Sequence, residues 1–114
     1  MNLTIYACAR KDVRELKEDL IHQCQQGEFG GWSYKYFSLG EEAIYKSISG
    51  NGTTRIVAFV IEEEEDGLVL SPAQMKGESD LSFNQFSNCF GDIVNLLINN
   101  LWKSIEVILI KKRN

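Results

Sequence analysis

The chain has 114 residues, of which 44% are hydrophobic and 25% charged, and its formal net charge at pH 7 is -4. A chain of this length and composition is expected to fold as one globular domain over residues 1–114, and it is neither disordered nor fibrous. The acidic balance argues against nucleic acid as a partner, because phosphate neutralisation needs a basic stripe and the one basic cluster is Lys111, Lys112 and Arg113.

The three cysteines, Cys8, Cys24 and Cys89, are odd in number and far apart, with no CxxC spacing that would indicate zinc or redox work. We expect them to be reduced core thiols. The N-terminal sequence has no long apolar segment, and no stretch approaches the roughly 18 apolar residues of a membrane helix. We therefore expect a cytoplasmic protein that makes no use of a membrane.

A strand and a helix are predicted first. Leu3–Ala9 alternates with a period of two and has apolar residues on both sides, as in an interior strand whose faces are both at least partly covered. Asp12 and Glu15 then form a capping-box pattern, which predicts a helix over residues 12–26. Its apolar side chains fall on one arc, and Gly27 is expected to end it.

Two further strands are predicted on either side of a short turn. Residues 43–49 fit either a helix or a strand, and the turn sequence 50–52 directly after them favours a hairpin. The run 53–61 is β-branched or aromatic almost throughout and predicts a central strand. A second hairpin is expected across Asp66-Gly67, with a strand at 68–70 that Ser71-Pro72 interrupts.

The last part of the chain predicts a loop, a helix and a strand. Residues 73–80 show no periodicity and are treated as a loop of open conformation. Ser82 and Gln85 form a capping box inside a hydrophobic staple, so a helix is expected over residues 82–101. The nearly continuous apolar run 105–110 predicts a buried strand near the middle of a sheet.

A strand with one aromatic face is also predicted after Gly31, where Trp32, Tyr34 and Tyr36 alternate with Ser33, Lys35 and Phe37. The predicted order of elements is therefore β-α-β-β-β-β-α-β. This order indicates an α+β fold with a mixed, mostly antiparallel β-sheet and two amphipathic helices on one face. The strands expected in the interior of the sheet are 3–9, 53–61 and 105–110.

No catalytic residue, metal site or cofactor is predicted. His22 falls on the polar side of the first helix, and there is no second histidine to complete a metal site or a catalytic pair. The glycine-rich segments 27–31 and 49–52 lack the spacing of a phosphate-binding loop and are read as turns. A cysteine nucleophile is not expected, because no histidine lies near any of the three thiols in the sequence.

The acidic run 62–66 and the aromatic segment 32–36 each allow more than one interpretation. Consecutive carboxylates on a turn diverge, so the run is read as a solvated hairpin tip or an acidic contact surface rather than a metal site. The alternating aromatic side chains either cover the sheet as part of the core or form an exposed row that anchors a protein partner.

Four features give the chain a resemblance to a known class of proteins. They are the compact acidic domain, the absence of a set of catalytic residues, the sequence EEEED at 62–66 and the sequence WSYKY at 32–36. The chain resembles the small cytoplasmic immunity proteins of bacterial contact-dependent growth inhibition and other polymorphic toxin systems. The resemblance implies a protein that neutralises a cognate toxin domain, often a basic nuclease, by stoichiometric occlusion and without turnover. The side chains expected to contact this basic protein partner are Glu62, Glu63, Glu64, Glu65, Asp66, Trp32, Tyr34 and Tyr36.

Two other classes of function remain open at this point. One is an interaction module or a subunit of a larger assembly. The other is a small enzyme whose carboxylates act without histidine.

Overall fold

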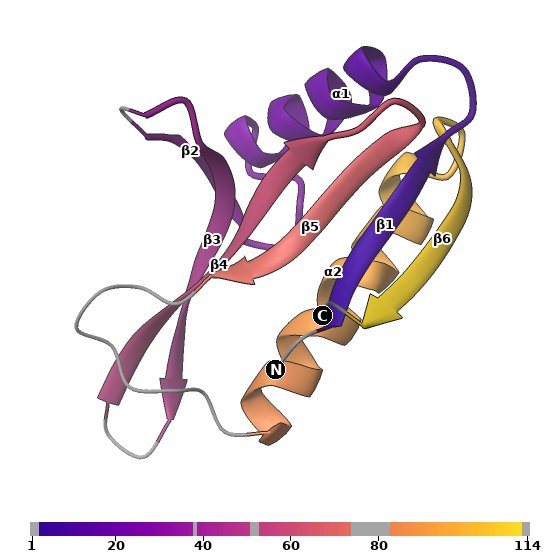
Figure 1. Cartoon of the computed structure of the whole chain (residues 1–114). Coiled ribbons are helices and arrows are strands. Elements are labelled where there is room, and N and C mark those ends of the chain that lie inside the picture. The colour runs from indigo at the N-terminus through magenta and orange to yellow at the C-terminus, as the bar shows by residue number, and fades with distance from the viewer. Residues whose placement is uncertain (1–2, 38, 51–52, 74–82, 113–114) are drawn as a thin grey trace.

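The structure is a computed structural model that describes residues 3–37, 39–50, 53–73 and 83–112 (Figure 1). This part of the chain has the predicted α+β class and the predicted order of elements. The elements are β1 (Leu3–Ala9), α1 (Val13–Gln25), β2 (Ser33–Tyr36), β3 (Glu42–Gly50), β4 (Thr53–Glu63), β5 (Gly67–Ala73), α2 (Phe83–Leu101) and β6 (Ile105–Lys112).

The described strands form one sheet with the order β2-β3-β4-β5-β1-β6, and every neighbouring pair in it is antiparallel. β1 and β4 lie in the interior of the sheet, as predicted. Residues 43–49 belong to a strand, and the register that sets Gly50 opposite Thr53 confirms the first hairpin. The turn residues 51–52 lie outside the described residues.

Both helices pack on the same face of the sheet, where they enclose the core (Figure 1). An amphipathic helix must bury its apolar arc, and the sheet offers an apolar face for it. The arc of α1 is buried through Leu16, Leu20 and Cys24, and that of α2 through residues such as Ile93 and Leu97. Neither helix in the described part is long and apolar enough to cross a membrane.

The predicted boundaries of α1 are confirmed. The Asp12 side chain accepts the backbone N–H of Arg14 at 2.9 Å and so caps the helix. At the other end Gly27 has a φ of 72°, and the N–H of Glu28 donates to the carbonyl of Gln23 at 2.8 Å. These are the features of a Schellman motif, which needs the left-handed conformation that glycine adopts without strain. The predicted cap of α2, Ser82, lies outside the described residues.

The prediction of a buried interior strand at 105–110 is wrong. β6 is an edge strand that pairs with β1 alone among the described strands. Val107, Leu109 and Ile110 are 43%, 41% and 56% exposed. The apolar run reflects a strand whose two faces both carry hydrophobic side chains, and not one with a neighbour on each side.

The predicted interruption of the second hairpin at Ser71-Pro72 is also wrong. β5 continues to Ala73, and Pro72 lies opposite Phe59 in the ladder with β4. The ladder between β5 and β1 ends where Leu70 meets Ile5. Pro72 therefore has a strand on only one side, where a residue without an N–H is tolerated.

Candidate functional site

The register of the sheet sorts its side chains onto two faces. Successive residues of a strand point to opposite faces, and residues directly opposite each other in neighbouring strands share a face. Ile5 and Ala7 of β1 are buried in the core under the helices. Tyr6 and Cys8 therefore lie on the opposite face, which no described helix covers and which we call the helix-free face.

One end of the molecule is hollowed where the β4–β5 turn, the β1–α1 connection and the beginning of β6 meet. The hollow encloses about 830 Å³. We call it the acidic hollow, and it is lined by Cys8, Ala9, Lys11, Asp12, Val13, Arg14, Glu63, Glu64, Glu65, Asp66, Glu106 and Val107.

The backbone fixes the acidic run, residues 62–66, which we call the acidic tip. The N–H of Glu64 donates to the carbonyl of Gly67 at 2.8 Å and closes the turn, while the N–H of Ala9 donates to the carbonyl of Asp66, also at 2.8 Å. A Cβ atom on Gly67 would overlap the backbone of Ala7, so only glycine permits this close approach. The Asp66-Gly67 turn thus holds the tip against the end of β1.

Negative charge dominates the acidic hollow. Six of its lining side chains are carboxylates, and two, Lys11 and Arg14, are cationic. All five residues of the acidic tip are exposed. Neither ion pair found among the described residues, Lys17–Glu42 or Lys46–Asp92, involves the tip. A cationic group that enters the hollow would therefore meet several carboxylates that lack a close cation of their own.

An apolar row leads from the edge of the sheet to the acidic tip along the helix-free face. Leu109, Tyr6 and Val69 lie opposite one another on β6, β1 and β5, and Val69 in turn lies opposite Glu62. We call Leu109, Tyr6 and Val69 the apolar row. The three side chains are half-buried or exposed and have no described helix above them.

Tyr6 stands in the field of the acidic tip. Burial raises the pKa of its phenol, and the carboxylates of Asp66, Glu64 and Glu65 raise it further. The Nζ of Lys111 lies 4.7 Å from the centre of the Tyr6 ring, within cation–π range. The face of this ring therefore already attracts a cation.

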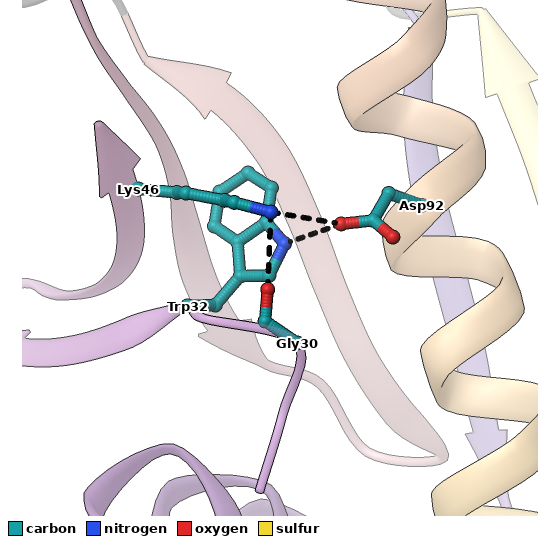
Figure 2. A network of polar contacts seen from close by, with 4 residues as sticks. All are labelled: Gly30, Trp32, Lys46 and Asp92. Atoms are coloured by element: carbon teal, nitrogen blue, oxygen red, sulfur yellow. Dashed lines mark hydrogen bonds and ion pairs between the residues drawn. The ribbon is translucent and has the colours of Figure 1, made fainter. Parts of the chain in front are cut away.

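Trp32, expected to be either core or partner surface, belongs to the core. It is 1% exposed, and its ring packs edge-on against Phe59 at a centroid distance of 5.8 Å. Its Nε1 donates to Asp92 Oδ2 of α2 at 3.0 Å, and Lys46 Nζ of β3 lies 3.6 Å from the same oxygen (Figure 2). Lys46 also donates to the carbonyl of Gly30 at 3.0 Å (Figure 2).

This network of Gly30, Trp32, Lys46 and Asp92 was not predicted from the sequence. It joins the connection between α1 and β2, strand β3 and helix α2, which are distant in the chain. The opposite charges of Lys46 and Asp92 are paired with each other, so the network ties the two layers together and offers little net charge to a ligand.

The other two aromatic side chains lie apart from the acidic hollow. Tyr34 is half-buried, and its hydroxyl donates to Glu42 Oε2 at 2.6 Å. Tyr36 is 62% exposed, but it lies opposite Glu42 on the helix side of the sheet, and β3 separates its strand from β4. The structure does not bring these tyrosines to the acidic tip, and a partner contact through them stays a prediction.

Within the described part of the chain, the histidine and the three cysteines do not come together in one reactive site. His22 is exposed on α1, as predicted. Burial raises the pKa of the Cys24 thiol to about 12 and also raises that of Cys89, while Cys8 is half-buried on the helix-free face. Among the described residues no group of three or more His, Cys, Asp and Glu side chains is placed to hold a metal ion.

No family model matches this chain, and neither curated proteins nor solved structures show significant similarity to it. What the acidic hollow binds is therefore inferred from its charge and geometry.

Proposed function

We propose that this chain is an immunity-type protein that binds a cognate toxin domain and neutralises it by stoichiometric occlusion, without catalysing a reaction. The toxin domain would be basic, as a nuclease is, and the complex would form in the cytoplasm. The observation that carries the proposal is the acidic hollow directly beside the apolar row of the helix-free face.

The acidic hollow supports the electrostatic part of this proposal. Nucleases hold phosphate oxygens with lysine and arginine side chains, and a carboxylate can take the place of a phosphate at such groups. All five carboxylates of the acidic tip are exposed, and those of Glu63, Glu64, Glu65 and Asp66 line the acidic hollow. A concentrated negative field of this kind raises the rate at which a cationic surface approaches.

The apolar row supports the proposal that the complex dissociates slowly. Binding energy in protein interfaces is concentrated in a few aromatic and apolar side chains surrounded by a polar rim. Tyr6 is the aromatic member of the row, and Glu62 and Lys111 stand at its margins. In the proposed complex a partner arginine or lysine displaces Lys111 from the Tyr6 ring, and the row loses its water.

Co-expression tests the proposal. The chain is co-expressed with the protein encoded by the neighbouring gene, and purification is followed by a growth test with and without this chain. We expect a one-to-one complex and growth that depends on this chain. Replacement of Tyr6 by Ala should weaken the complex. Ile98→Ala, which removes a half-exposed side chain on α2 that is not among the expected contacts, should not.

The other outcomes separate the alternatives. A stable complex without growth protection would identify an interaction module or subunit and contradict neutralisation. Protection that persists at a small fraction of the toxin concentration would contradict stoichiometric occlusion and indicate an enzyme.

A further inference from the structure

The two edges of the sheet differ in how well they are protected against pairing with another chain. β2 forms one edge, has four residues and includes Lys35. Short strands and lysine side chains are common means of blunting a sheet edge. β6 forms the other edge with eight residues, and it contains no proline and no charge between Glu106 and Lys111. The central part of the β6 edge, from Val107 to Ile110, therefore lacks the protection that the β2 edge has.

The exposed edge is apolar on both faces. Val107 and Leu109 lie opposite Cys8 and Tyr6 and so point to the helix-free face, while Ile110 lies opposite Ile5 on the helix side. All three side chains are exposed. The outer N–H and C=O groups of an edge strand have no partner strand and act as a template for one.

We propose that β6 pairs in antiparallel orientation with β6 of a second copy of this chain and joins two six-stranded sheets into one. The order of charges along the strand identifies the second copy as the partner. Glu106 stands at the beginning of β6, and Lys111 and Lys112 stand at its end. Antiparallel pairing of this strand with itself sets a negative end against a positive end twice, whereas parallel pairing would set like charges together.

The charges also select the register. A two-fold axis perpendicular to the sheet requires opposed residues to share a face, so one residue must lie opposite its own copy. The two central residues of β6, Ile108 and Leu109, give the longest pairing. With Leu109 on the axis, Ile108 meets Ile110 and the end at Glu106 meets the end at Lys112. With Ile108 on the axis, Glu106 would meet Ile110. The pairing centred on Leu109 therefore satisfies the charges at both ends.

Glu106 lies at the point where the ladder between β6 and β1 shifts register, since Cys8 pairs with Val107 and Ala9 with Ile105. The regular part of the edge is thus Val107 to Lys112. In the proposed dimer the Glu106 carboxylate lies at one end of this regular part, next to Lys111 and Lys112 of the second copy.

The interface has one strand pair as its centre, which places it in the small class, below about 1,200 Å² in total. We expect a dimer in exchange with monomers that dissociates on dilution. Glu106 and Val107 also line the acidic hollow, so the dimer is tested with the purified chain alone, in the absence of any partner of the hollow.

Sedimentation analysis of the full chain over an about hundredfold range of concentration tests the dimer. The wild-type chain should change from monomer to dimer as concentration rises. Leu109→Lys sets two like charges together on the two-fold axis and should weaken the dimer about tenfold or more. The control is Leu39→Lys, because Leu39 is 92% exposed and lies far from β6 in the β2–β3 turn. It should leave the dimer unchanged, and circular dichroism establishes that both variants are folded.

A charge swap tests the register. At low ionic strength Glu106→Lys and Lys112→Glu should each weaken the dimer about three- to tenfold, and the double variant should restore it to within about twofold of wild type. Three results would each overturn the proposal: a wild-type chain that stays monomeric throughout, a Leu39→Lys variant as impaired as Leu109→Lys, or a double variant no better than the single ones.

Discussion

Glu42 of β3 is held by two side chains, one from a helix and one from the edge strand. Lys17 of α1 forms an ion pair with it, and the Tyr34 hydroxyl donates to it. Burial raises the pKa of Glu42, but the hydrogen bonds from Lys17 and Tyr34 and the charge of Lys17 outweigh burial, so its pKa lies below 4.5. Burial and the bond to Glu42 raise the pKa of Tyr34 to about 12. The ion pair that links Lys17 of α1 to Glu42 therefore requires the ionised form of Glu42.

The depressed pKa of Glu42 predicts a pH dependence of stability. At a pH between the pKa of Glu42 in the folded chain and its higher pKa in the unfolded chain, the unfolded chain binds more protons. The contribution of Glu42 to stability is therefore present above about pH 4.5 and is lost as the pH falls through the lowered pKa of the folded chain. Glu42→Gln should lower the free energy of unfolding by about 1–2 kcal/mol near neutral pH and by less in acid. Urea denaturation at several pH values measures this. The neighbouring exposed Glu41→Gln is the control, and an equal loss at every pH would contradict the assignment.

Helix α2 shows what the sequence can establish at the scale of an element. A helix on a sheet must place its apolar residues on one arc, and that arc is legible in a single sequence. Both helices were therefore predicted with nearly their observed bounds. Leu97 is 1% exposed in the core and the next residue, Ile98, is 50% exposed, so the arc has a sharp margin.

Adjacent substitutions on α2 test that margin. Leu97→Ala leaves a cavity under the helix and should cost about 2–5 kcal/mol of unfolding free energy. Ile98→Ala removes a side chain of similar size that is already half in water and should cost less than about 1 kcal/mol. Chemical denaturation of the two variants side by side gives the comparison. Equal losses would mean that the helix is rotated from its orientation in the structure.

The strands show where prediction from the sequence ends. Local pattern identified every strand, but it assigned residues 105–110 to the interior, where the structure has an edge. A run of alternating side chains that is apolar on both sides fits an interior strand and also an edge strand that carries an interface. Which of the two occurs depends on strand order, which is fixed by pairings between distant residues such as Ile5 with Ile110.

At the scale of the whole molecule, the two faces of the sheet differ in what they carry. The helix side holds the core, and the helix-free face carries the apolar row that ends beside the acidic tip. The sequence located the tip, because five consecutive acids and an Asp-Gly turn are local features. It could not associate the tip with Tyr6 and Leu109, because that association needs β5, β1 and β6 to be neighbours. Trp32 was predicted from the sequence as a candidate partner contact, but its side chain is buried against Phe59.

The central claim is that the acidic tip steers a basic protein partner into the complex. Its most direct test is the association rate, measured by stopped flow with the co-purified partner as a function of ionic strength. The variant Glu63→Gln/Glu64→Gln/Glu65→Gln removes three carboxylates that line the acidic hollow. Its matched control, Glu18→Gln/Glu28→Gln/Glu41→Gln, makes the same change in net charge at exposed positions elsewhere.

Steering by a local field falls with salt and with the loss of the charges that create it. The tip variant should associate about threefold or more slowly at low ionic strength, with a flatter salt dependence, and its stability should stay within about 0.5 kcal/mol of wild type. The control should associate at nearly the wild-type rate. An unchanged rate for the tip variant at low salt, or an equal loss in the control, would contradict the claim.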